Sequence, residues 1–221
     1  KNDDEYFNAI KKWYLNKFDI ELKQEWLVIT PVVGVALAQS VKALTNENDY
    51  VLINNPVYYT FSKIVLDNKR QIISSDLVLR DGHYEIDFSD FENKIKQYNV
   101  KMFLLCSPHN PLVGFGLKDE LDKIVKFSSK YKVFIVSDEI HCDITNPQKE
   151  YIPFASVSKT NLENTIMCIA PTKAFNMAGM QTACIVVANE VLRHKVNRGI
   201  NTDEVAEPNS FAICATKAAS I

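Results

Sequence analysis

Three apolar runs of this chain are each followed by a polar residue that could do chemistry. These residues are Asn110, Asp138 and Lys173, and the runs are 101–106, 133–136 and 165–170. Continuous apolar runs of this length are typical of buried parallel strands, and ligands bind outside the carboxyl ends of such strands. We therefore expect an amide, a carboxylate and an amine to meet at one edge of a sheet.

Taken singly, each residue also has an ordinary structural explanation. Asn110 precedes Pro111, and this pair is common in turns. Asp138 could cap a helix that follows it, and Lys173 could be a solvated strand end, because Lys is among the most exposed residue types. The coincidence at successive strand ends is what favours chemistry.

The trio matches the needs of pyridoxal 5'-phosphate catalysis. A lysine amine condenses with the cofactor aldehyde, and a carboxylate keeps the pyridine nitrogen protonated, so that the ring accepts electrons. An amide is suited to bond the phenolic oxygen of the ring. Tyr58 or Tyr59, after the apolar run 50–53, could cover the ring face, and residues 30–34 open an expected helix whose N-terminus could hold the phosphate.

The elements that must position these residues alternate along the chain. Helices are expected at 6–18, 32–44, 60–68, 88–98 (capped by Asp87) and 118–130. Strands are expected at 26–29, 50–53, 70–74 and at the three runs above, with a further apolar run at 183–188. Segment 79–86 is polar and turn-like around Asp81-Gly82. This order predicts an α/β fold with three αβα layers and a mostly parallel sheet, with no linker to divide it.

Composition excludes several other classes of protein. The net charge of -2 gives no electrostatic footprint for nucleic acid or an anionic membrane surface. No apolar run approaches the roughly 20 residues that a membrane-spanning helix needs. The five cysteines are scattered and mostly lie inside apolar runs, which indicates reduced thiols and a cytoplasmic protein.

Four motifs in the same order resemble a known family. They are Asn55-Pro56-Val57-Tyr58-Tyr59, Cys106-Ser107-Pro108-His109-Asn110-Pro111, Ser137-Asp138-Glu139-Ile140-His141 and residues 170–181. The chain is similar to the large domain of fold-type I pyridoxal-phosphate enzymes of the class I/II aminotransferase superfamily. More narrowly, it resembles the bacterial C–S β-lyases of the MalY/PatB type, often called cystathionine β-lyases.

The resemblance assigns a role to each matching residue. It implies that Lys173 bonds the cofactor covalently and acts in catalysis, and that Asp138 pairs with the pyridine nitrogen. It implies that Asn110 bonds the phenolic oxygen, that Tyr58 stacks on the ring, and that His141 supports the ring or its aspartate. The phosphate is expected at the remaining positions, which are the amides of Val33 and Gly34 and the hydroxyl of Thr172.

The sequence departs from the family's pattern in two places. The family usually reads Thr-Pro-Gly-Val-Val-Pro at the phosphate loop, whereas residues 30–35 are Thr-Pro-Val-Val-Gly-Val, so the glycine stands two places later. The family also tends to have Gly-Arg-Val-Trp soon after the Asn-Pro pair. Residues 113–116 are Val-Gly-Phe-Gly, so we expect the salt bridge of that arginine to be missing.

The resemblance implies β-elimination from L-cystathionine or S-substituted cysteines, giving pyruvate, ammonia and a thiol. Transamination shares the chemistry up to removal of the Cα proton, and only the subgroup resemblance favours the lyase. A third hypothesis is an inactive or regulatory scaffold. The altered phosphate loop would then indicate that activity has been lost. A homodimer is expected because fold-type I enzymes generally act as dimers.

A metal site is the remaining rival. Cys106 and His109 have CxxH spacing, and the pair His141-Cys142 follows later in the chain. Zinc motifs rely on two paired spacings, and here the second half is an adjacent pair. Both pairs already fall in segments that are expected to line the cofactor site at the sheet edge, so we predict no metal.

The resemblance also predicts the domain organisation. Residues 1–221 correspond to the pyridoxal-phosphate-binding large domain. The family's N-terminal segment and its C-terminal small domain, which carries the arginine for the substrate α-carboxylate, are expected to lie outside this chain. The chain starts at Lys1 without Met and stops at Ile221 in an alanine-rich helical pattern. We therefore expect an excerpt of a longer polypeptide that is inactive alone.

Overall fold

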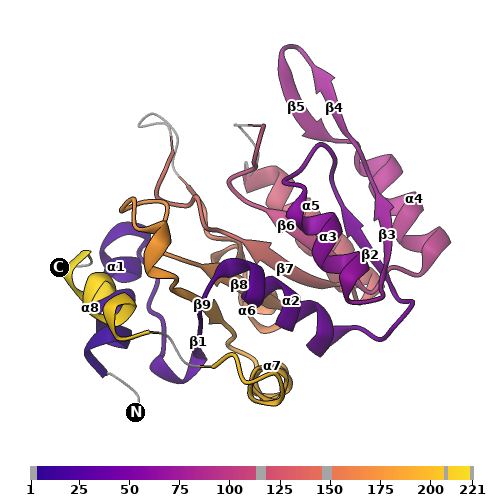
Figure 1. Ribbon diagram of the computed structural model, residues 1–221. Coiled ribbons are helices and arrows are strands. Elements are labelled where there is room, and N and C mark those ends of the chain that lie inside the picture. Colours follow the sequence, from indigo (N-terminus) through magenta and orange to yellow (C-terminus); the bar gives the residue numbers. More distant parts are fainter. Residues whose placement is uncertain (1–3, 113–117, 146–150, 207–208, 220–221) are drawn as a thin grey trace.

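The computed structural model describes residues 4–112, 118–145, 151–206 and 209–219. Its centre is a seven-stranded sheet in the order β1-β9-β8-β7-β6-β2-β3 (Figure 1). The strands are β1 (Leu27–Thr30), β2 (Tyr50–Ile53), β3 (Gln71–Ser74), β6 (Met102–Cys106), β7 (Phe134–Asp138), β8 (Thr165–Ile169) and β9 (Ala183–Val186). The five strands from β3 to β8 are parallel, and β9 runs antiparallel to its neighbours β8 and β1. The predicted mostly parallel sheet is confirmed.

Helices cover both faces of the sheet, as three αβα layers require. They are α1 (Asp4–Phe18), α2 (Val33–Leu44), α3 (Thr60–Asp67), α4 (Phe88–Tyr98), α5 (Lys118–Tyr131), α6 (Lys159–Asn164), α7 (Glu190–Thr202) and α8 (Ser210–Ala219). One hydrophobic core joins α2, α3 and α7 to the first face. Two further clusters join α4 and α5, and then α1, to the second face. Side chains that alternate along the strands supply both cores, because successive residues of a strand point to opposite faces.

The predicted element boundaries agree with the structure to within two residues, and one difference matters for the site. Strand β7 was expected to end at Val136, but it continues through Ser137 to Asp138. Asp138 is therefore the last residue of a strand rather than a loop residue. The expected cap of α4 is present, since the Asp87 carboxylate accepts the amide of Ser89 at 3.0 Å.

The expectation that segment 79–86 is merely turn-like was wrong. Strands β4 (Leu77–Arg80) and β5 (His83–Ile86) form an antiparallel hairpin that projects from the body of the molecule (Figure 1). Asp81 and Gly82 form its two-residue turn with positive φ angles of 50° and 79°. This is the backbone that tight hairpins need. The strands escaped prediction because they bury only Leu77 and Ile86, at their ends.

Helix α7 also went unpredicted, although its signal is in the sequence. Leu192, Val196 and Ile200 follow one another at intervals of four and are buried against the first face of the sheet. The side chain of Asn189 caps the helix by accepting the Leu192 amide at 3.0 Å. None of the helices in the described ranges is long and apolar enough to cross a membrane.

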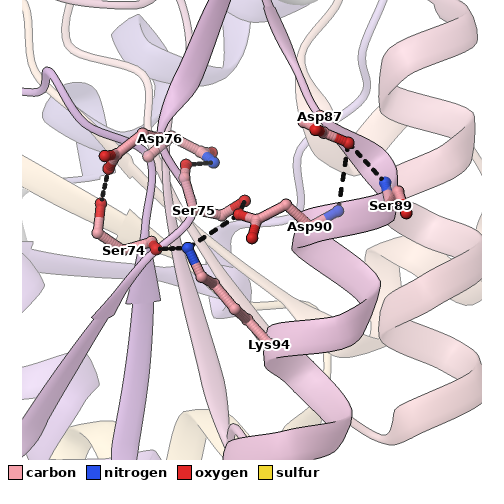
Figure 2. A network of polar contacts seen from close by, with 8 residues as sticks. Ser74, Ser75, Asp76, Asp87, Ser89, Asp90 and Lys94 are labelled. Carbon is pink, nitrogen blue, oxygen red and sulfur yellow. Dashed lines mark hydrogen bonds and ion pairs between the residues drawn. The ribbon is translucent and has the colours of Figure 1, made fainter.

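A polar network joins the end of β2 to the loop after β3 and to α4, and Figure 2 shows its contacts among Ser75, Asp90 and Lys94. The side chain of Asn54 donates to the Ser75 carbonyl at 2.8 Å, and the Ser75 hydroxyl donates to Asp90 on α4 at 2.7 Å. Lys94 pairs with Asp90 at 2.9 Å and donates to the Ser74 carbonyl. Asn54 therefore starts the loop to α3 from a fixed point on the neighbouring strand and helix.

Candidate active site

A cavity of about 370 Å³ lies at the carboxyl ends of β6, β7 and β8. All eight residues that the sequence singled out line it: Val33, Gly34, Tyr58, Asn110, Asp138, His141, Thr172 and Lys173. The expected convergence of an amide, a carboxylate and an amine at one sheet edge is therefore present. The individual roles of these residues toward a cofactor stay predictions.

Asp138 supplies the carboxylate of the cavity. Its side chain ends β7, is only 6% exposed, and accepts the Ile140 amide at 3.2 Å. Burial raises the pKa of Asp138 to about 7, and the bond from Ile140 offsets part of that rise. The alternative role as a helix cap is wrong, because the residues after Asp138 form a turn. Burying a carboxylate without a positive partner is costly, so this cavity favours a cationic group.

Lys173 reaches the cavity from a tight turn after β8. The amide of Phe175 donates to the Pro171 carbonyl at 3.0 Å, and the amide of Met177 donates to the Thr172 carbonyl at 3.0 Å. These two bonds fix the backbone on either side of Lys173. The pKa of His141, which lines the same cavity, is lowered by burial and further by the charge of Lys173. Both effects favour the neutral form of the imidazole.

Asn110 is held by the strand end before it. Its amide donates to the Cys106 sulfur at 3.3 Å, and the Cys106 thiol donates to the Pro108 carbonyl at 3.5 Å. Burial raises the pKa of Cys106 to about 12, so the group is a thiol rather than a thiolate. Among the residues that the structure describes, no group of three or more His, Cys, Asp or Glu side chains is arranged to hold a metal.

The segment just before α3 supplies an aromatic wall of the cavity, and the N-terminus of α2 supplies another wall. Tyr58 lines the cavity, whereas its neighbour Tyr59 lies outside it and is 72% exposed. Helix α2 begins at Val33, so the amides of Val33 and Gly34 have no acceptor one turn earlier, whereas those of Val35 and Ala36 donate to the Val32 carbonyl. The glycine shift has therefore left a regular helix N-terminus. The other departure, at residues 113–116, lies outside the described residues.

The sequence did not point to Glu139, which is fully buried beside Asp138. Its carboxyl accepts the Tyr151 hydroxyl and, at 3.1 Å, the Phe154 amide. Burial raises the pKa of Glu139 to about 7. Because side chains alternate along a strand, an Asp-Glu pair at a strand end sends one carboxyl to each face. That alternation was the signal that could have located Glu139. Cavity residues Thr60, Ile140, Ala178 and Thr182 carried no such signal.

Comparisons with known proteins agree with this geometry. The family model described as aminotransferase class I and II matches residues 2–216. Cystathionine beta-lyase PatB of Bacillus subtilis (strain 168) is 34% identical over 212 residues, which cover 96% of this chain and 55% of PatB. The chain belongs to the class I and II aminotransferase family. It spans about half the length of the curated relatives that it matches.

Two solved structures superpose over the whole chain. Cystalysin from Treponema denticola, which contains a pyridoxal 5'-phosphate cofactor, has a TM-score of 0.96 and 32% identity, and the match covers 56% of cystalysin. A pyridoxal-phosphate-bound protein from Clostridium difficile 630, provisionally described as an aminotransferase, has a TM-score of 0.96 and 39% identity, with 57% of that protein covered. The αβα fold is thus shared with pyridoxal-phosphate-containing proteins.

Replacing Asp138 with Asn should stabilise the cofactor-free protein more at pH 8 than at pH 5. Burial holds the pKa of Asp138 at about 7, above its ordinary value of 3.8. Between these values the folded state keeps a proton that the unfolded chain has released, so this carboxyl lowers stability as pH rises. Asparagine does not titrate and keeps an oxygen for the Ile140 amide. We expect the gain in free energy of unfolding to grow by at least about 1 kcal/mol between the two pH values, as measured by urea unfolding.

The matched control is Asp122→Asn on the exposed face of α5. Its effect should be the same at both pH values, because Asp122 is exposed to water in the folded state as it is in the unfolded chain. Glu139 is present in all three proteins, so its own titration largely cancels in the comparison. A gain from Asp138→Asn that is equal at pH 5 and pH 8 would contradict the raised pKa.

Proposed function

We propose that this chain is the cofactor-binding large domain of a pyridoxal-phosphate-dependent carbon–sulfur lyase. Its reaction is β-elimination of cysteine thioethers to pyruvate, ammonia and a thiol. The observation that carries the proposal is the single cavity that brings Asp138, Lys173 and Asn110 together with the N-terminus of α2. The 34% identity to cystathionine beta-lyase PatB supports the lyase assignment.

The cavity fits pyridoxal phosphate in charge and in size. The buried carboxyl of Asp138, with its pKa raised to about 7, would gain from a protonated pyridine nitrogen beside it, because an opposite charge lowers the pKa of an acid. The volume of about 370 Å³ falls in the range of roughly 300–1,000 Å³ that is usual for small-ligand sites. The free amides at the start of α2 suit a phosphate.

Each wall of the cavity has a part in holding the cofactor. Asp138 would pair with the ring nitrogen, and the Asn110 side chain would donate to the phenolic oxygen. Tyr58 would cover one ring face. The first-turn amides of α2, at Val33 and Gly34, would bind the phosphate. The buried Thr172 side chain, next to Lys173, would add a hydroxyl donor to the phosphate.

The bound cofactor would supply an electron sink for a carbanion at the substrate Cα. Lys173 would take the Cα proton on its amine nitrogen, acting as general base. The backbone hydrogen bonds of its turn fix the Cα of Lys173 and so limit where its amine can lie. Proton transfer needs a base that is held close to the proton it removes. The lowered pKa of His141 favours its neutral form, which would add no second positive charge beside Lys173. Paired with the ring nitrogen, Asp138 would keep its negative charge.

The substrate class follows from the lyase relatives, so we propose L-cystathionine or other S-substituted cysteines. In full-length form the protein would act as a homodimer in the cytoplasm, with the family's small domain binding the substrate carboxylate. The buried thiols Cys106, Cys142, Cys168 and Cys184 are consistent with a reducing compartment.

A second candidate function is transamination. The neighbour from Clostridium difficile 630, at 39% identity, is provisionally described as an aminotransferase. Both reactions use the same base and the same carboxylate, and they differ in where the proton goes after it leaves Cα. In transamination, Lys173 would return the proton to the cofactor. In the lyase reaction, the thiolate would leave Cβ before the proton is returned.

The full-length protein with pyridoxal phosphate should form pyruvate from L-cystathionine without an added α-keto acid. The elimination needs no amino-group acceptor, whereas transamination stops after one turnover without one. Pyruvate is measured by coupled NADH oxidation with lactate dehydrogenase. Lys173→Ala should lower the rate by at least about 10³-fold, since it removes the base. No pyruvate from L-cystathionine, together with formation of an amino acid from an added keto acid such as α-ketoglutarate, would contradict the lyase and support the aminotransferase.

Replacing Gly34 with Ala tests the phosphate site separately from the chemistry. A Cβ at this position would meet no protein atom within 4 Å, so the cofactor-free protein should fold as well as the wild type or better, by up to about 1 kcal/mol. The methyl group would stand at the end of α2 that lines the cavity. Cofactor affinity should fall, as measured by titration of the visible absorbance band.

Gly179→Ala is the matched control, because a Cβ there also meets no protein atom within 4 Å and Gly179 is not among the residues that line the cavity. It should bind the cofactor as the wild type does. Equal affinity of Gly34→Ala and Gly179→Ala would show that the phosphate does not lie at the N-terminus of α2.

A further inference from the structure

Helix α1 lies far from the cavity residues in sequence but touches the loop that carries His141. The indole nitrogen of Trp13 donates a hydrogen bond to Asp143 Oδ1 at 2.9 Å across 130 positions of sequence. Lys17, one helical turn later, pairs with the same oxygen at 2.6 Å. The Asp143 side chain is only 8% exposed. This carboxylate is therefore held from α1 by two donors, two residues after His141.

The same tryptophan touches the turn that carries Lys173. The ring of Trp13 packs edge-on against Phe175, with centroids 5.1 Å apart and an angle of 67° between the planes. Phe175 is two residues after Lys173, and its amide bond to Pro171 makes it part of the tight turn. Figure 1 shows α1 beside the orange segment that follows β8. The Trp13 side chain thus contacts both the loop that carries His141 and the loop that carries Lys173.

Two neighbouring contacts extend this bridge along α1. The Tyr14 hydroxyl lies 3.5 Å from the sulfur of Cys142, the residue between His141 and Asp143. The ring of Phe18 packs edge-on against Tyr151 at 5.4 Å, and Tyr151 in turn donates to the buried Glu139. The contacts of Trp13, Tyr14, Lys17 and Phe18 on α1 are therefore made with the segments that follow β7 and β8.

We propose that Trp13, Lys17, Asp143 and Phe175 form a clamp that sets the position of Lys173 relative to His141 and Asp138. We call these four residues the α1 clamp. The proposal rests on the proposed function, since it gives the clamp the task of orienting the cofactor lysine. Trp13 and Asp143 are positioning residues, because they act through Lys173 and His141 and do not line the cavity.

The indole N–H is the part of the clamp that can be removed cleanly. Trp13→Phe deletes the hydrogen bond to Asp143 and keeps an aromatic ring to pack against Phe175. Asp143→Ala removes the acceptor, whereas Asp143→Asn keeps an oxygen for Trp13 and loses only the charge that Lys17 pairs with. Rescue by Asn therefore separates the hydrogen bond from the ion pair. Trp26→Phe, at the other tryptophan, is the control.

The experiment uses full-length protein loaded with pyridoxal phosphate. The readouts are the rate at which the cofactor dissociates into excess buffer and the visible circular dichroism of the bound cofactor, which reports how rigidly it is oriented. Trp13→Phe and Asp143→Ala should release the cofactor about tenfold faster, the effect of losing one hydrogen bond to a charged group. Both should also lower the visible circular dichroism per unit of absorbance. Asp143→Asn should lie close to the wild type.

Dissociation rates and circular dichroism of Trp13→Phe and Asp143→Ala that equal those of Trp26→Phe would overturn the clamp. So would a loss of thermal stability in the cofactor-free protein with no change in either readout, since that is the mark of a purely structural contact. A wild-type protein that shows no visible absorbance band with pyridoxal phosphate would instead overturn the proposed function. The α1 clamp would then have no cofactor lysine to orient.

Discussion

The carboxyl group of Asp138 lies at the end of a central strand, where it has almost no contact with water. In register with it, β6 and β8 place the thiols of Cys106 and Cys168 on either side. An uncompensated carboxylate in these surroundings is costly, and the raised pKa expresses that cost. Asp138 and Lys173 line the same cavity, so a cationic group bound there would offset the cost of burying this carboxylate.

Two sets of contacts support the cavity from opposite sides. On one side, Asn54 ties the loop after β2, which leads to Tyr58, to Ser75 and through it to α4 (Figure 2). On the other side, Trp13 joins the loops after β7 and β8. Both are polar or aromatic contacts between segments distant in sequence. A strand fixes only the first residue or two of the loop that follows it. These contacts fix the later residues of the loops after β2, β7 and β8.

Sequence reasoning located the strand ends because buried parallel strands leave long apolar runs, and Asn110, Asp138 and Lys173 each follow one. It missed the hairpin of β4 and β5, whose strands bury little and so carry almost no periodic signal. It could not find Trp13 as a partner of Asp143, because no local pattern links residues 130 positions apart. Pairings of this kind depend on how helices pack, which the spacing of apolar residues does not specify.

The most direct test of the account is to find where pyridoxal phosphate attaches. The full-length protein is incubated with the cofactor, reduced with borohydride and digested, and the peptides are analysed by mass spectrometry. The account predicts that the pyridoxyl group is on the peptide that contains Lys173 and that Lys173→Ala removes it. A pyridoxyl group spread over exposed lysines such as Lys63 and Lys69, with none on Lys173, would contradict it.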